Sequence, residues 1–129
     1  MIAVDSSVWI AQLQGRTTAA VVKLEAAAAQ GPLLVGDLIL LEVLQGARND
    51  AHATRIERAL RRYVVVPLLG APLAAKAARN YRRLRELGVT VRKTADIVIG
   101  TFCIEHDHAL LHDDRDFAPM QKHLGLKVL

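Results

Sequence analysis

The sequence predicts an α/β fold, with a central and mostly parallel sheet of about five short strands wrapped by about seven helices. Short apolar runs rich in β-branched residues alternate with longer segments of helical period, which is the pattern of a parallel sheet covered by helices. No repeat of fixed period, flexible linker or charge block marks a second domain. Residues 1–129 are therefore expected to form one domain.

The expected elements follow from these runs in chain order. The apolar runs predict strands at Ile2–Val4, Leu33–Val35, Tyr63–Val66, Ala109–Leu111 and Lys127–Leu129. The segments of helical period predict helices at Ser7–Gln14, Thr18–Gln30, Leu38–Ala47, Ala51–Arg62, Pro72–Leu87, Thr94–His106 and Asp116–Leu124. Three end signals support these helices: Pro72 at a first position, Gly88 after a last turn, and Thr94 as an N-cap.

Composition narrows the class of protein. The chain is 52% hydrophobic and 23% charged, which excludes a disordered chain. Cys103 is its only cysteine, so no internal disulfide and no zinc site of several cysteines can form. There is no signal peptide and no apolar run of the ~20 residues that a membrane span needs. We therefore expect a soluble, cytoplasmic protein with no membrane partner, and we expect Trp9, Phe102 and Cys103 to lie in its core.

Asp5 directly follows the first predicted strand. In parallel sheets, ligands and catalytic groups gather beyond the carboxyl ends of strands, which makes Asp5 a candidate site residue. The alternative is that it caps the following helix. Ser6 or Ser7 can take over that capping role, which would free the Asp5 carboxylate.

Two further acids stand in apolar helices. Glu42 shares a predicted helix face with Leu38 and Leu41, which would turn it toward the core, although the edge of that face is an alternative. Asp96 lies in the first turn of the most apolar helix of the chain. A favourable contact with the helix dipole explains an acid there, but a carboxylate with apolar flanks also needs a cation, supplied by Arg92, by Lys93 or by a metal.

A fourth acidic segment, from His112 to Phe117, follows the fourth predicted strand. Its carboxylates repel one another unless positive charge lies among them, although Asp116 is also expected to cap the next helix, at least partly. Asp5, Asp96 and Asp114 would meet at one edge of the sheet, with Glu42 reaching in from a helix. Carboxylates in that number suit Mg²⁺ or Mn²⁺, with positions left for phosphate oxygens, which is typical of a nuclease site.

Together these motifs resemble the PIN-domain ribonucleases, and in order, spacing and length the VapC toxins of bacterial toxin–antitoxin pairs in particular. The similarity spans nearly the whole chain and rests on four segments: Val4-Asp5-Ser6-Ser7, Leu41-Glu42-Val43-Leu44-Gln45-Gly46, Thr94-Ala95-Asp96-Ile97-Val98-Ile99 and Leu110-Leu111-His112-Asp113-Asp114-Arg115-Asp116-Phe117. No single segment is specific, but four in this order make a strong joint match.

The resemblance implies a PIN-like nuclease domain whose metal is held by Asp5, Glu42, Asp96 and Asp114, with Asp116 binding directly or through water. It also implies pocket hydroxyls at Ser6, Ser7 and Thr94, whereas His112 stands where Thr or Ser is more usual. The implied chemistry is hydrolysis of RNA phosphodiester bonds assisted by Mg²⁺ or Mn²⁺, with one of the acids Asp114 and Asp116 as a proton acceptor. The implied partners are RNA, a VapB-like antitoxin and a second copy in a homodimer.

Arginine predominates among the cations, with twelve of the seventeen Lys and Arg residues. Two helices carry arginine stripes, Arg55/Arg58/Arg61/Arg62 and Arg79/Arg82/Arg83/Arg85, and such stripes are more often solvated faces than binding sites. Arg92 and Lys93 precede Asp96 and Arg115 lies among the acids of the fourth segment, so these three are the candidate RNA contacts.

Two other functions remain as alternatives. In a haloacid-dehalogenase-like phosphatase the acid after the first strand attacks phosphate, but a second Asp is expected where Ser7 stands. In a non-catalytic response-regulator-like module an Asp is expected after the third strand, where Pro67-Leu68-Leu69 offers none. RNA cleavage that is lost in chelator and restored by Mg²⁺ or Mn²⁺ distinguishes the nuclease from the module, whereas a phosphorylated Asp5 would favour the phosphatase.

Overall fold

A computed structural model describes residues 1–129 and shows five parallel strands in one sheet. The strand order is β3-β2-β1-β4-β5, with β1 at Ile2–Val4, β2 at Leu33–Gly36, β3 at Val64–Val66, β4 at Ala109–Leu111 and β5 at Lys127–Val128. The predicted α/β class and the five strands are therefore confirmed, with strand ends that differ by one residue at most.

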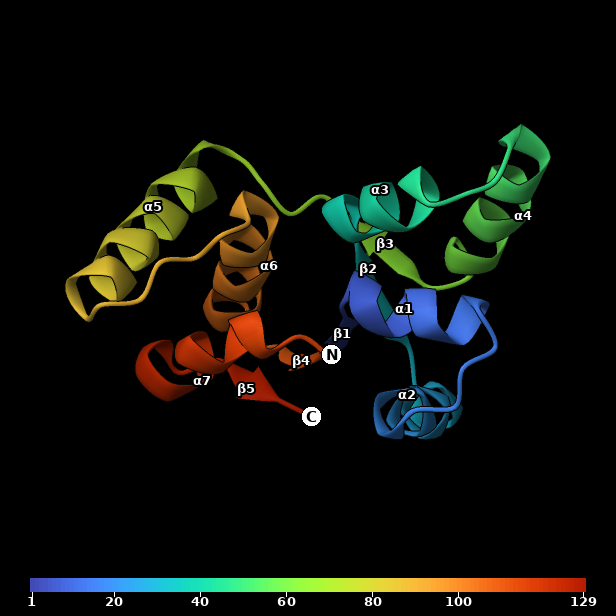
Figure 1. Ribbon diagram of the computed structural model, residues 1–129, viewed down its shortest axis with the longest axis horizontal. Coiled ribbons are helices and arrows are strands. Elements are labelled where there is room, and N and C mark those ends of the chain that lie inside the picture. Colours follow the sequence, from blue (N-terminus) through green and yellow to red (C-terminus); the bar gives the residue numbers. More distant parts are fainter.

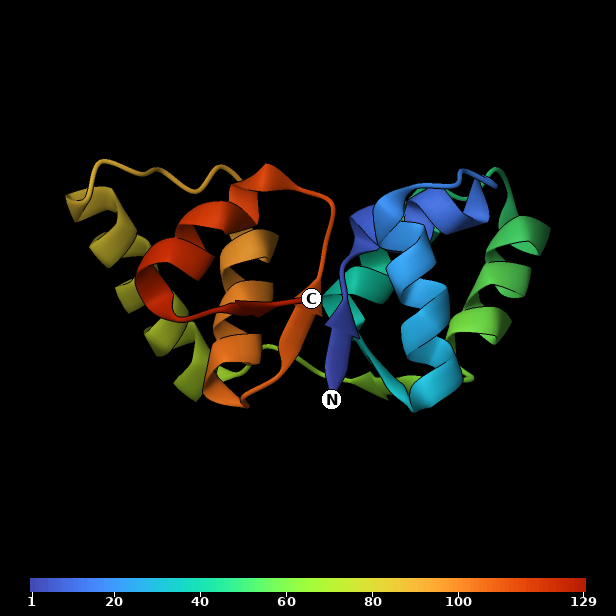
Figure 2. The same ribbon diagram turned by 90° about the horizontal axis from the view of Figure 1, so that it is seen from below.

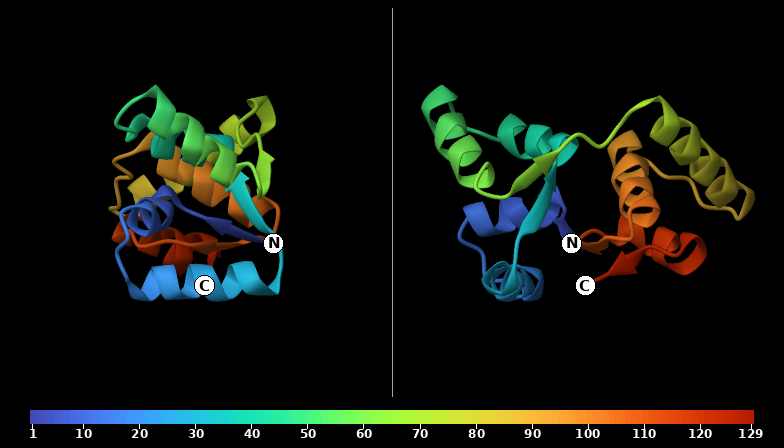
Figure 3. Two further views of the ribbon diagram at one scale, coloured as in Figure 1. Left: turned by 90° about the vertical axis from the view of Figure 1, so that its right-hand side faces the viewer. Right: turned by 180° about the vertical axis from the view of Figure 1, so that it is seen from behind.

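Seven α-helices surround this sheet in two groups, one on each side of its centre (Figure 1). Helices α1 (Ser6–Leu13), α2 (Ala19–Gln30), α3 (Asp37–Gln45) and α4 (Asp50–Leu60) form one half, and α5 (Ala71–Glu86), α6 (Thr94–Glu105) and α7 (Ala118–Leu124) form the other. Seen from behind, the segment between β3 and α5 is the connection between the two halves on that side of the molecule (Figure 3). None of these helices is both long enough and apolar enough to span a membrane.

The core is one continuous cluster of aliphatic and aromatic side chains from both halves. Strand β2 is buried along its whole length, and α6 is buried from Asp96 to Cys103, as its uninterrupted apolar sequence predicts. Trp9, Phe102 and Cys103 are all buried, which confirms their predicted place in the core. Burial on all sides leaves α6 little freedom to shift, so its first turn is held rigidly against the sheet.

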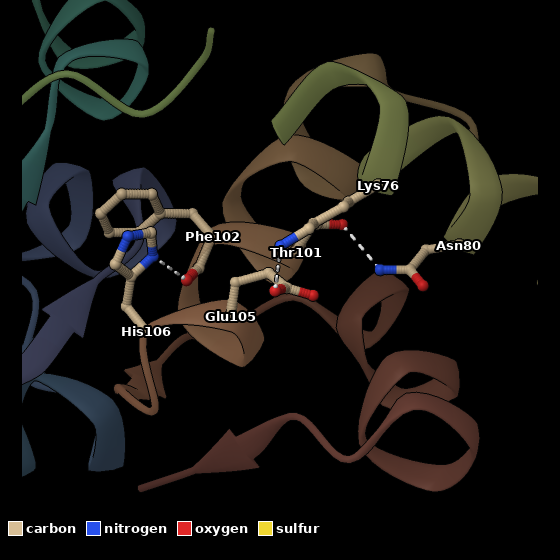
Figure 4. A network of polar contacts seen from close by, with 6 residues as sticks. All are labelled: Lys76, Asn80, Thr101, Phe102, Glu105 and His106. Carbon is tan, nitrogen blue, oxygen red and sulfur yellow. Dashed lines mark hydrogen bonds and ion pairs between the residues drawn. The ribbon is translucent and has the colours of Figure 1, made fainter. Parts of the chain in front are cut away.

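Polar contacts also join α5 to α6 (Figure 4). Asn80 donates from Nδ2 to Thr101 Oγ1 at 3.1 Å, and Lys76 Nζ lies 2.8 Å from Glu105 Oε2. The Asn80 bond satisfies the hydroxyl of the fully buried Thr101, which would otherwise be costly to desolvate. These two contacts join the side of α5 that carries Lys76 and Asn80 to α6.

The helix bounds differ from the predictions by one or two residues, and the predicted starts of the last two helices were wrong in their caps or first residues. Lys93 rather than Thr94 is the N-cap of α6, and Thr94 is its first residue. A 3₁₀ turn, η1 at Arg115–Phe117, occupies the start of the last predicted helix, so α7 begins at Ala118. Asp116 does not cap α7 as expected, because the N-cap of that helix is Phe117. Asp116 lies inside η1 instead, and its amide donates a hydrogen bond to the side chain of Asp114. Gly88, with φ of +84°, follows α5 as predicted.

Candidate metal centre

The carboxyl ends of β1 and β4 lie side by side and lead into α1 and η1, close to the first turn of α6 (Figure 2). The register pairs Val4 with Leu111, and the amide of Asp5 donates to the carbonyl of Leu111 at 2.9 Å. Asp5 therefore leaves the sheet at the same level as the loop that carries Asp114. Parallel pairing of two short strands is what brings these distant segments together.

Three carboxylates form a compact group at this edge. One oxygen from each of Asp96, Asp114 and Asp116 lies within 4.8 Å of the others. Asp96 comes from the first turn of α6, whereas the other two come from the loop after β4 and from η1. The structure thus brings together three of the five predicted site acids at ligand distance from one another.

Asp96 is the most perturbed member of this group. Its side chain is buried, and its Oδ2 has no hydrogen-bond partner. Burial, reinforced by the negative charges of Asp5 and Asp114, raises the pKa of Asp96 to about 7, although Lys93 acts in the opposite direction. A buried carboxylate with an unpartnered oxygen beside other carboxylates is costly without a cation close by.

Asp5 is buried beside this group, and its Oδ2 is held by Ser7. The hydroxyl of Ser7 donates to that oxygen at 2.6 Å, its amide donates at 3.1 Å, and the hydroxyl accepts from the amide of Asp113 at 3.1 Å. Asp5 is thus the N-cap of α1, which is the alternative that the sequence left open for it, and neither serine takes over that role. The Ser7 link between the ends of β1 and β4 is a contact that the sequence did not reveal, because it joins residues 106 positions apart.

Glu42 approaches from α3 and accepts a hydrogen bond from Ser6 Oγ at 3.2 Å. Desolvation, together with the charge of Asp5, raises the pKa of Glu42 above its ordinary value. The face of α3 that meets the core consists of Ile39 and Val43, whereas Leu41 is 52% exposed, so the predicted core face of this helix was wrong. Glu42 lies at the edge of the buried face, half-buried, which is the alternative the sequence left open.

His112 also lies at this edge. Its Nδ1 accepts a hydrogen bond from the amide of Asp114 at 3.2 Å, and its ring packs against Phe117 with centroids 5.0 Å apart. Burial lowers the pKa of His112 below its ordinary value, although the surrounding acids oppose this effect. Through its hydrogen bond, His112 contacts the loop that carries Asp114.

The three basic residues predicted to contact RNA differ in whether they pair with an acid of the protein. Arg92 is exposed and pairs with Asp116, at 3.0 Å, whereas Lys93 and Arg115 are exposed and form no ion pair.

Thr94 lines, with Arg92, a largely apolar cleft of about 580 Å³ between α5 and α6. Gly100 lies in the middle of α6, and its lack of a side chain allows Met120 to pack closely against the helix. A glycine inside an apolar helix was the signal in the sequence that could have predicted this contact.

All the donors in this group are carboxylate oxygens, and no cysteine or histidine belongs to it. Such a donor set fits a hard divalent cation such as Mg²⁺ or Mn²⁺ rather than a soft metal. The unpartnered oxygen of buried Asp96 shows in addition that the protein itself does not neutralise this carboxylate fully. The residues present therefore fit a divalent metal site.

Comparison with known proteins identifies the type of domain. The profile of the PIN domain family matches residues 2–122. Ribonuclease VapC11 of Mycobacterium tuberculosis and VapC ribonuclease Mb1587 of Mycobacterium bovis are each 29% identical to the chain over 119 residues, covering 91% of this chain and 89% of theirs. This match favours the nuclease hypothesis over the phosphatase and response-regulator alternatives.

Solved structures show the same fold. A chain of VapBC2 from Rickettsia felis, bound to a DNA fragment from its promoter, superposes with a TM-score of 0.79 at 12% identity and covers 100% of this chain and 98% of that one. A chain of FitAcB from Neisseria gonorrhoeae superposes with a TM-score of 0.74 at 16% identity, covering 100% of this chain and 96% of that one.

Proposed function

Because this chain belongs to the PIN domain family, we propose that it is a divalent-metal-dependent endoribonuclease acting as the toxin of a VapBC-type toxin–antitoxin pair. The observation that carries this proposal is the buried, unpartnered carboxylate of Asp96 within a group of acids at the carboxyl edge of a parallel sheet. The VapC ribonucleases among its relatives, which match about nine-tenths of the chain, support the choice of RNA as substrate.

The proposed metal ligands are Asp5, Glu42, Asp96 and Asp114, with Asp116 binding directly or through water. Mg²⁺ and Mn²⁺ are the metals that an all-carboxylate donor set favours. When bound, the cation would activate water as the nucleophile and stabilise negative charge on the leaving 3′-oxygen.

The chain's own residues prepare this site in three ways. Ser7 fixes the Asp5 carboxylate and ties it to the loop after β4, and Ser6 orients Glu42, so these acids need little rearrangement. Asp114 and Asp116 are the candidates for accepting the proton of the attacking water, because both lie in the group and are partly exposed. Lys93 and Arg115, exposed and without an acidic partner, are suited to phosphate oxygens of the substrate.

We propose two protein partners as well. A VapB-like antitoxin would contact the edge of this site, and Leu41, exposed one residue before Glu42 on α3, offers an apolar anchor for it. A toxin–antitoxin complex from Klebsiella pneumoniae, which superposes on this chain with a TM-score of 0.71 at 18% identity, supports the antitoxin proposal. The second proposed partner is another copy of this chain, in a homodimer. We also propose that the protein acts in the cytoplasm, which is consistent with the proposed RNA substrate.

The decisive experiment is cleavage mapping on total RNA with the wild-type protein, Asp5→Asn and Asp96→Asn. Cleavage by the wild type should disappear in chelator and return with Mg²⁺ or Mn²⁺, whereas both variants should lose at least about a hundredfold of the rate. Asp50→Asn removes an exposed acid from α4 and serves as the matched control. Undiminished cleavage by both site variants would contradict the proposal.

A further inference from the structure

Two polar clefts on the surface meet at one residue, His123 of α7. The first, of about 450 Å³, is lined by Arg115, Asp116 and Lys122, so it begins at the acidic group of the metal centre. The second, of about 710 Å³, lies between α5 and α7 and is lined by Arg79, Arg82 and Arg83, among others. Because His123 lines both clefts, they adjoin, and their lining residues together extend from Asp116 to α5.

The arginines face this surface because of how α5 is attached to the rest of the molecule. Asn80 and Lys76 bond to α6 (Figure 4). Leu73, Ala77 and Leu84 of the same helix are buried. The remaining positions of the helix include Arg79 and Arg83, which lie one turn apart and therefore on the same side. Helix α7 packs against α5, and the cleft between them receives both arginines.

The positive charge of this surface is offset only in part within the protein, because Arg79 interacts with the charge of Glu105 without forming an ion pair with it. Arg79, Arg82, Arg83, Arg115 and Lys122 form no ion pair, whereas the four ion pairs of the molecule involve Arg61, Lys76, Arg92 and Lys127. Glu86 is the one acid in the second cleft, and Asp116, the one acid in the first, already pairs with Arg92. Like charges one helical turn apart repel, so an anionic partner would stabilise this arrangement.

We propose that the surface formed by Arg79, Arg82, Arg83, Arg115, Lys122 and His123 binds the sugar–phosphate backbone of RNA on one side of the scissile bond. This inference rests on the proposed function, because its position matters through its continuity with the metal centre. Arginine pairs with phosphate in a bidentate manner, which suits the residues that predominate here. Neither cleft is lined by Phe, Tyr or Trp, so bases do not stack on the surface and it recognises RNA without sequence preference.

The surface has consequences for substrate length. Arg79 and Arg83 line only the cleft that does not contain Asp116, so we expect that a very short oligonucleotide bound at the metal centre does not reach them. Longer RNA gains affinity from the additional phosphate contacts, and that gain depends on salt because counterions are released.

The test compares two double variants that each remove two exposed helical charges. Arg79→Gln/Arg83→Gln alters the proposed surface, and Arg55→Gln/Arg58→Gln alters the stripe on α4, whose arginines line none of these clefts. Binding of a fluorescein-labelled 30-nucleotide RNA and of a labelled 4-nucleotide RNA is measured by anisotropy in EDTA, over a range of salt concentrations. Thermal melting verifies that both variants are folded.

The α5 variant should bind the long RNA about tenfold more weakly, with the slope of log K against log salt reduced by about 1.4, because each phosphate contact with a single strand contributes about 0.7. The α4 variant, and the short RNA with either variant, should match the wild type. Equal losses of RNA binding in the two variants would overturn the inference, and so would unchanged RNA binding by the α5 variant.

Cleavage assays separate this inference from the proposed function. With Mn²⁺ present, the α5 variant should show a raised KM for long RNA and an unchanged kcat, because it loses binding remote from the reacting atoms. Absence of cleavage by the wild type would contradict the proposed function, whereas normal KM in the α5 variant would contradict the backbone surface alone.

Discussion

Arg92 donates from a single nitrogen, Nη2, to both carboxylate oxygens of Asp116, at 3.0 and 3.2 Å. Asp116 therefore has a cation from the protein, whereas Asp96, in the same acidic group, has an oxygen with no partner at all. The charge of the group is offset at its exposed rim and not in its buried part.

Replacing Arg92 with glutamine should strengthen metal binding. The arginine competes with a metal for Asp116 and lowers the negative potential of the site, so Arg92→Gln should bind Mn²⁺ several-fold more tightly by titration calorimetry. Stability should stay within about 1 kcal/mol of the wild type, because a pair with a 71% exposed arginine is screened by solvent. Weaker Mn²⁺ binding would show instead that Arg92 positions Asp116 for the metal.

Asp96→Asn should separate stability from activity. The substitution keeps the size of the side chain and removes a carboxylate that is buried among other acids, so the metal-free protein should be more stable at pH 7.5, by about 1–3 kcal/mol. RNA cleavage should be lost at the same time. Urea unfolding in EDTA measures the first effect, and a less stable variant would contradict the electrostatic account of Asp96.

The stability of the metal-free protein should fall as pH rises from about 4 to about 7. The pKa of Asp96 rises from 3.8 to about 7 on folding, so its contribution is fully present below 3.8 and is lost as the pH passes through the folded value. The raised pKa of Glu42 acts in the same direction. Unfolding in EDTA at several pH values, with Asp96→Asn as control, should show a smaller slope for the variant; identical slopes would exclude Asp96 as the source.

Ser7→Ala should reduce cleavage by about tenfold or more with little loss of stability. The Ser7 hydroxyl orients Asp5 and accepts a hydrogen bond from the amide of Asp113. Its removal therefore loosens Asp5, a proposed metal ligand, without creating a cavity in the core. The rate should also require a higher Mn²⁺ concentration for half-maximal activity, because the loosened ligand binds the metal more weakly. An unchanged metal dependence would mean that Ser7 does not position Asp5 for the metal.

Gly36→Ala should destabilise the fold by about 1–3 kcal/mol. A Cβ at this position would lie 2.4 Å from Leu68 Cδ1 and less than 3 Å from two further atoms of that buried side chain. The double variant with Leu68→Ala should lose less stability than the two single variants together, because the smaller side chain relieves the clash. Additive losses in denaturant unfolding would refute this packing relationship.

The local pattern of the sequence was enough to predict the sheet, the buried helix α6 and the acids that end β1 and β4. Strand and helix periodicity depend on neighbouring residues, and an acid in an apolar segment stands out without any tertiary information. The prediction was wrong where two local explanations competed, as for the cap of α6, the first residues of α7 and the core face of α3.

Only the tertiary structure decided which residues meet. The register of β1 against β4 and the packing of α6 place Asp96 beside Asp114 and Asp116, and the same register lets Ser7 reach Asp113. The two arginine stripes look equivalent in the sequence but differ in their surroundings. Arginines of the α5 stripe line a cleft that adjoins the one containing Asp116, whereas the α4 stripe lines neither cleft. Periodicity determines the face of a helix on which a residue lies, but the element that packs against that face depends on the whole chain.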